Sequence, residues 1–168
     1  MEARARLYDA LAARDAQALF AAAEAANDPF LWNLAARHLR FEVVDLALAA
    51  RAGEAAVRGS GALWLPARDV LASVRNMEGR PTEALRLLDP HDRVPTERPR
   101  GSLWHEAISA EAHLRLGEEA QARRTLERAA EDRRILPHLR ADPVFAPLAD
   151  VFRDADERFF YEVLFARE

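Results

Sequence analysis

The stretch from residue 63 to residue 89 reads LWLPARDVLASVRNMEGRPTEALRLLD, and its pattern decides the fold. Its first half places apolar residues at i, i+1, i+4, i+7, i+8 and i+11, which together form one face of an α-helix. Gly79 suits the left-handed conformation in which a helix ends and the chain reverses. Pro81 can then occupy the first turn of a second helix. The stretch therefore predicts an antiparallel helical hairpin. The apolar residues of the first helix are Leu63, Trp64, Ala67, Val70, Leu71 and Val74.

The same pattern recurs along the chain, and Leu-Trp pairs mark its copies, at spacings typical of helical hairpin repeats. The pairs begin at Leu31, Leu63 and Leu103. The third copy also has a turn glycine, Gly117, followed by the helix-forming segment EEAQARRTLERAAE. The first copy, residues 29–53, has no turn glycine, so the sequence leaves two alternatives open there: a hairpin, or one long helix with a bend.

The second and third copies share the pattern Gly-x4-Ala-x3-Leu after the turn, which resembles the turn and second helix of a tetratricopeptide repeat over residues 61–132. The resemblance implies an all-α fold of antiparallel helix-hairpin repeats, a tetratricopeptide-like α-solenoid. It also implies a scaffold or adaptor that binds a protein or peptide in a groove lined by the first helix of each hairpin. The residues that the resemblance places in this groove are Asp69, Ser73, Asn76, Trp104, Glu111 and Arg115.

The whole chain, residues 1–168, is predicted to form one helical-repeat domain. Residues 1–53 supply the leading helices, over 3–13, 16–26 and onward from the Asp-Pro pair at 28–29, with Asp15 as an N-cap. Residues 61–132 form the two hairpins. The proline-rich segment 89–101 between them is predicted to be a loop. A further helix is predicted to start at the Asp-Pro pair at 142–143.

Residues 133–168 are predicted to close the array. The chain ends in an aromatic-rich amphipathic helix over 156–166, in which Phe159, Phe160, Val163 and Leu164 lie near one side. Helical arrays need an atypical end to cover their last apolar face. We expect this helix to cap the preceding repeat in a monomer. The alternative is a homodimer that packs through it, in which case the protein is a structural subunit that self-associates.

Composition limits the classes of partner. The net charge of −4 and the pI near 5.8 argue against a nucleic-acid or anionic-membrane binder, because phosphate contacts usually need a basic excess. The chain has no cysteine, so disulfides and cysteine-ligated metals are excluded. No segment is predicted to be a signal peptide or a membrane span. We therefore expect a cytoplasmic protein with no cofactor.

The histidines offer the alternative of a helical hydrolase or ribonuclease that uses His105 or His138. His105-Glu106 is similar to a zinc-protease helix motif, but the second histidine of that motif is replaced by serine. The spacings Arg100–His105 and Arg133–His138 are similar to the Arg-x4-His pair of the HEPN ribonucleases, without the polar residue that follows the arginine there. These features favour a solvated surface over a catalytic or metal site.

Two further features admit a structural and a functional interpretation. Glu111 falls on the apolar face of its predicted helix, where a carboxylate is costly unless it is paired. It is expected to pair with Arg115 at i+4 or with a neighbouring helix, and the alternative is a polar contact in a ligand groove. The acidic run at 150–157 lacks the spacing of a calcium loop, which favours a solvated helical face.

Overall fold

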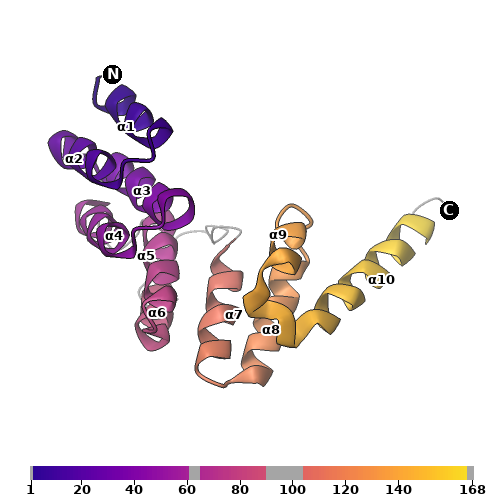
Figure 1. Ribbon diagram of the computed structural model, residues 1–168. Coiled ribbons are helices and arrows are strands. Elements are labelled where there is room, and N and C mark those ends of the chain that lie inside the picture. Colours follow the sequence, from indigo (N-terminus) through magenta and orange to yellow (C-terminus); the bar gives the residue numbers. More distant parts are fainter. Residues whose placement is uncertain (1, 61–64, 90–103, 166–168) are drawn as a thin grey trace. The chain divides into compact units, whose positions relative to one another are not determined.

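The computed structural model of the protein describes residues 2–60, 65–89 and 104–165, with the side chains of residues 60 and 159–165 excepted. Within these ranges every regular element is helical and no strand is present (Figure 1). The all-α prediction is therefore confirmed for the described part of the chain. The chain divides into two compact units, Met1–Ser102 and Leu103–Glu168, and each has its own hydrophobic cluster. Whether residues 1–168 behave as one domain stays a prediction.

The first unit consists of three helical hairpins in succession. Each helix packs against the next one along the chain. In addition, α3 contacts both α1 and α5, and α2 contacts α4, so the first helices of neighbouring hairpins touch (Figure 1). The hairpins are α1 (Glu2–Ala12) with α2 (Ala16–Ala26), α3 (Pro29–His38) with α4 (Leu46–Ser60), and α5 (Leu65–Met77) with α6 (Pro81–Leu88).

The core of the first unit is made largely of alanine and leucine, which lets the helices approach closely. The only large aromatic pair in its described part is Phe20 against Trp32, whose ring centroids lie 5.1 Å apart in an edge-to-face arrangement. Gly53 on α4 lies against Leu71 on α5, where a Cβ atom would come within 3.2 Å of the Leu71 side chain. Small residues thus set the spacing between α4 and α5.

Each hairpin turn contains one residue in the left-handed conformation. These residues are Arg14, Val44, Gly79 and Gly117, with φ of 52°, 60°, 75° and 76°. They fix a common register, because the fifth residue after each of them is fully buried in the helix that follows. Those buried residues are Leu19, Ala49, Ala84 and Ala122. The alignment of Gly79 with Gly117 that the sequence suggested therefore extends to two turns without glycine.

The first Leu-Trp copy forms a hairpin and not one bent helix, which decides between the two alternatives that the sequence left open. After α3 the chain makes a π-helical turn, η1 (Leu39–Val43), and then reverses at Val44. The Asp45 side chain accepts a hydrogen bond of 3.0 Å from the backbone N–H of Leu48 and so caps the start of α4. The carboxylate cap starts a new helix here, although no glycine marks the turn.

The tryptophans do not occupy equivalent positions in their hairpins. Trp32 lies in the first turn of α3 and is buried, whereas Trp104 directly precedes α7 and is 41% exposed. Trp32 precedes its left-handed turn residue by 12 positions and Trp104 by 13. A shift of one position moves a side chain by about 100° around the helix axis, so the two tryptophans face different surroundings. Trp64 lies outside the described residues, as does the predicted loop from residue 90 onward.

Two predicted helix starts in the first unit are confirmed in detail. The Asp15 carboxylate accepts from the backbone N–H of Ala18 at the start of α2, and Asp28 does the same for Leu31 at the start of α3. Between α2 and α3, Asn27 is in the left-handed conformation, and Pro29 takes the first position of α3. These local signals were readable because capping depends on side chains adjacent in sequence.

The second unit is built on the hairpin of α7 (His105–Arg115) and α8 (Glu119–Ala130). The short helix α9 (Leu136–Ala141) and the 3₁₀-helix η3 (Pro143–Leu148) follow it. Asp142 caps the start of η3, as predicted, although the turn that follows is 3₁₀ rather than α-helical. Pro147 inside it lacks the N–H that a regular helix needs.

The last helix, α10 (Ala149–Phe165), starts before the predicted helix over 156–166. Its first turns carry Val151 and Phe152 into the core of the second unit, and it contacts α8, α9 and η3. The side chains of Phe159, Phe160, Val163 and Leu164 lie outside the described ones. The capping role of this apolar stripe therefore stays a prediction.

Candidate partner-binding surfaces

The predicted groove residues of the first unit lie on α5 and are buried. Asp69, Ser73 and Asn76 follow one another at i, i+4 and i+7, so they share one side of the helix. Each is less than 4% exposed. The structure therefore brings these three polar residues together on α5, with little accessible surface for a ligand.

The predicted groove residues of the second unit lie along α7. Trp104 packs against His138 of α9, with ring centroids 5.8 Å apart. Glu111 and Arg115 form the i, i+4 ion pair expected from the sequence, with 2.9 Å between Arg115 Nε and Glu111 Oε1. The Glu111 side chain is only 12% exposed, so the ion pair neutralises a largely buried carboxylate. The two sets of predicted residues lie in different units, and their use as one groove stays a prediction.

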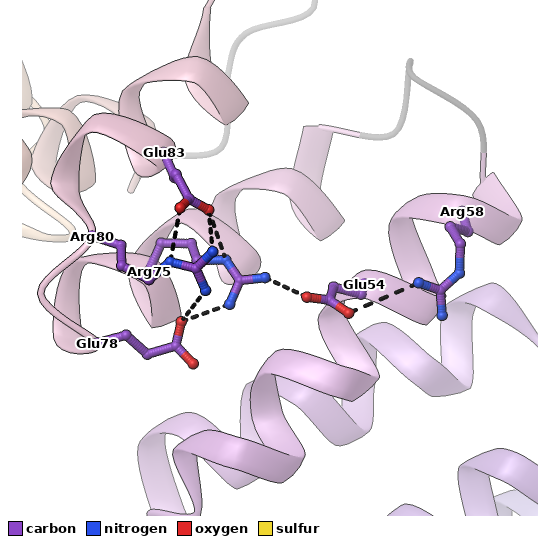
Figure 2. Close-up of polar contacts among 6 residues, drawn as sticks. All are labelled: Glu54, Arg58, Arg75, Glu78, Arg80 and Glu83. Atoms are coloured by element: carbon purple, nitrogen blue, oxygen red, sulfur yellow. Dashed lines mark hydrogen bonds and ion pairs between the residues drawn. The ribbon is translucent and has the colours of Figure 1, made fainter.

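The most developed polar site of the first unit surrounds Arg75, at the end of α5 (Figure 2). Its guanidinium side chain is 9% exposed and bonds Glu54 of α4. It also bonds Glu78 at 2.6 Å and lies 3.7 Å from Glu83 of α6. Burial lowers the pKa of Arg75, but the hydrogen bonds that its guanidinium donates to Glu78 and Glu54 outweigh this effect and hold that pKa above its usual value.

Two further arginines nearer the surface, Arg80 and Arg58, complete what we call the Arg75 cluster. Arg80 bonds Glu83 at 2.6 Å and Glu78 at 3.3 Å, and Arg58 lies 3.9 Å from Glu54 (Figure 2). Three cations and three carboxylates therefore balance one another. The arrangement ties α4, α5 and α6 together, and its charges are already matched within the chain.

A different surface lies on the first helices of the first two hairpins. The Arg4 guanidinium of α1 lies 5.9 Å from the ring centroid of Tyr8 and 5.6 Å from that of Phe30 on α3. Both rings are about half exposed, at 46% and 49%. These distances are those of cation–π contacts. The contact spans two hairpins and remains open to solvent.

This surface continues along α3. Arg37 lies two turns beyond Phe30 on the same side of α3, and Phe41 follows in the π-helical turn η1, where it is 55% exposed. The Arg40 guanidinium lies 4.7 Å from the centroid of the Phe41 ring. We call Arg4, Tyr8, Phe30, Arg37 and Phe41 the arginine–aromatic face.

The second unit has an open cleft of about 650 Å³ between the end of α8, α9 and the middle of α10. Arg133, Arg140 and Arg158 line it. Arg140 is paired with Asp156 at 2.6 Å, and Arg158 donates to the backbone carbonyl of Asp154 at 3.3 Å. Arg140 and Arg158 are therefore already engaged within the unit, which makes the cleft a weaker candidate than the arginine–aromatic face.

Two of the histidines in the alternative enzyme and metal interpretations have ordinary partners. His113 Nδ1 lies 2.6 Å from Glu118 Oε2, and His138 packs on Trp104. Arg100 lies outside the described residues. Across residues 2–60, 65–89 and 104–165, no group of three or more histidine, aspartate or glutamate side chains is placed to hold a metal.

The acidic run at the start of α10 is tied to neighbouring arginines. Arg123 of α8 donates to both carboxylate oxygens of Asp150, at 2.6 and 3.2 Å, and lowers the pKa of that carboxyl. Asp156 pairs with Arg140, and Asp154 lies 3.7 Å from Arg153. The run is therefore a charged helical surface that fastens α10 to α8 and α9.

The arginine–aromatic face did not figure among the residues predicted from sequence. A signal for it was present, because Phe30 and Phe41 fall outside the buried apolar stripe of α3 and η1, which consists of Leu31, Trp32, Ala35, Ala36 and Leu39. A large apolar residue off the buried stripe points to solvent or to a partner. The contact between Arg4 and Phe30 was not readable, because it depends on the packing of α1 against α3.

Within the described residues, no helix is both long and apolar enough to cross a lipid bilayer. No protein-family model matches the sequence, and comparison with curated proteins and with solved structures likewise finds no match.

Proposed function

We propose that this protein is a scaffold of tetratricopeptide-like helical hairpins that binds a protein or peptide partner. The observation that carries the proposal is the exposed arginine–aromatic face, shared by the first helices of two consecutive hairpins. Tyrosine, other aromatic residues and arginine are enriched where proteins bind one another, because they combine large contact area with directed polar groups.

The regular turns support the repeat part of this proposal. Four hairpins share one left-handed turn residue and one buried position five residues later. In the first unit α3 contacts both α1 and α5, the neighbourhood expected of stacked repeats. Stacking of this kind presents the first helices side by side, so that a partner can contact several of them at once.

The test is a selection of peptides on the intact protein. A phage-displayed random peptide library is panned against the immobilised full chain, and enriched peptides are synthesised and titrated by calorimetry. We expect saturable binding with one peptide per chain, and loss of binding when Tyr8 and Phe30 are both replaced by Ala. A matched control replaces the exposed Leu116 of the second unit by Ala. Failure of independent libraries to give any saturable binder would contradict the proposed function.

A further inference from the structure

We infer that the arginine–aromatic face recognises an acidic segment of a partner protein, whose carboxylates are held by Arg4 and Arg37. This inference rests on the proposed function and names the chemistry of the partner. It starts from the contrast between these two arginines and the Arg75 cluster. In that cluster every cation meets a carboxylate, whereas on this face the cations meet aromatic rings or water.

Arg4 is held ready for an anion by its position over two rings. Its guanidinium lies over both Tyr8 and Phe30, and no carboxylate among the described side chains pairs with it. Stacking restricts the long side chain but leaves the N–H groups at the edge of the guanidinium plane free to donate. A carboxylate that approaches along this edge can accept two parallel hydrogen bonds, the strongest arrangement for such a pair.

Arg37 supplies a second cation on the same face. It is exposed on α3 and has no ion-pair partner among the described residues. The one carboxylate of α3 and η1 is Glu42, which is engaged with His38 at 2.7 Å. The Asp28 carboxylate at the start of α3 accepts from the backbone N–H of Leu31. The face thus offers two positive charges and three partly exposed rings, which suit a segment that alternates acidic and apolar residues.

The geometry favours a peptide over a single-stranded nucleic acid, which would also meet arginine and aromatic groups. Nucleic-acid binding of that kind depends on bases that stack on open ring faces. Here Arg4 lies over the rings of Tyr8 and Phe30, and Arg40 lies over the ring of Phe41. Guanidinium groups therefore take the place that bases would need. The net charge of −4 adds a general repulsion of polyanions.

The experiment uses the peptides enriched in the selection described above, labelled with fluorescein and followed by fluorescence polarisation. We expect the enriched sequences to be rich in Asp and Glu. Arg4→Gln and Arg37→Gln are each expected to weaken binding by about tenfold, the size expected for loss of one charge-assisted hydrogen-bonded pair. The matched control is Arg86→Gln, which removes an exposed charge from α6, outside the face. Circular dichroism checks that each variant keeps its helicity and its melting temperature.

The outcomes separate this inference from the proposed function. Two outcomes overturn the inference and leave the scaffold function standing. In the first, the enriched peptides contain no acidic residues. In the second, the peptides are acidic, but Arg86→Gln reduces their affinity as much as Arg4→Gln does. Absence of any saturable peptide overturns both. A fluorescein-labelled oligothymidine probe supplies the last arm. Binding of this probe that is lost in Arg4→Gln, without peptide binding, would assign the face to nucleic acid instead.

Discussion

Val44 is a β-branched residue in a backbone conformation that side chains of that shape rarely adopt. Its φ of 60° and ψ of 54° put it in the left-handed region, where the two equivalent positions in later hairpins hold Gly79 and Gly117. The Cβ atom of an L-residue meets the following carbonyl oxygen there, at a cost of about 1–2 kcal/mol. The Val44 side chain is 62% exposed and so recovers little of this cost through burial.

Replacement of this residue should therefore stabilise the protein. We expect Val44→Asn to raise the free energy of unfolding by about 0.5–1 kcal/mol, because asparagine tolerates the left-handed region. Asn27 already adopts it between α2 and α3. Gly79→Ala makes the opposite change, because it places a Cβ atom on a left-handed residue. It should lower the free energy of unfolding by about 1 kcal/mol. Backbone strain alone would cause this loss, since nothing lies within 4 Å of a Cβ atom placed there. Urea denaturation measures both, and a destabilised Val44→Asn would contradict the account.

Asp132 provides a prediction on pH. Its carboxylate accepts hydrogen bonds from the Arg134 side chain and from the Arg134 backbone N–H. These bonds, the side-chain bond more than the backbone one, lower the pKa of Asp132 to about 2. Because the pKa is lower in the folded state, this stabilisation is present above the ordinary aspartate value of about 4. It is lost as the pH falls towards 2.

An NMR titration of the carboxyl carbons tests this prediction directly. The Asp132 resonance should titrate with a midpoint near 2. Arg134→Gln should move the midpoint upwards, yet not fully to the ordinary value, since the backbone donor remains. A wild-type midpoint near that of an unperturbed aspartate would show that the pair does not persist in solution.

At the scale of elements, the hairpins of the first unit are joined by apolar packing and by the Arg75 cluster. Arg75 alone reaches carboxylates on α4, on α6 and in the turn between α5 and α6. The energetic weight of each cation should follow its burial, because water screens exposed pairs and competes for them. The three arginines of the cluster, Arg75, Arg80 and Arg58, should therefore contribute progressively less to the free energy of unfolding.

This gradient is testable by single substitutions to glutamine. Arg75→Gln should cost about 1–3 kcal/mol, less than the loss of a fully buried pair, because Glu54 and Glu83 can regain water. Arg80→Gln should cost less than about 1 kcal/mol, and Arg58→Gln close to nothing, because these side chains are 45% and 72% exposed. Urea denaturation of the three variants gives the order. Equal costs would mean that burial does not govern the strength of the cluster.

At the scale of the whole molecule, the two units have separate cores, and this predicts their unfolding. Scanning calorimetry of the full chain should resolve two transitions. Leu19→Ala should lower the temperature of one and Leu126→Ala that of the other, since each residue is fully buried in a different cluster. Each truncation of a buried leucine should cost about 2–5 kcal/mol. A single transition that both variants lower equally would show that the units unfold as one.

The end of α10 gives a second prediction at this scale. Deletion of residues 156–168 removes the apolar segment FFYEVLF but keeps Val151 and Phe152 in the core. If the segment caps the second unit, the intact protein runs as a monomer on size exclusion with light scattering, and the truncated protein unfolds without cooperativity or becomes insoluble. An intact dimer whose truncation yields a well-folded monomer would show that the segment is a dimer interface instead.

The sequence by itself determined the helical class and most element starts. Helical periodicity, capping by Asp15, Asp28 and Asp142, and the turn glycines are local features, because capping and turn chemistry involve residues within a few positions of one another. The ion pair of Glu111 with Arg115 was likewise readable from its i, i+4 spacing.

Only the tertiary structure decided the features that join distant residues. The π-helical turn and the left-handed Val44 form a hairpin at a site where the sequence has no turn glycine. The packing of α3 on α4 outweighs the backbone strain at Val44. Packing also buries Asp69, Ser73 and Asn76 and exposes Trp104. Arg4 meets Phe30, and Arg75 meets Glu54, because helices that are far apart in sequence lie side by side. Such contacts depend on how helix faces meet, which no short-range pattern specifies.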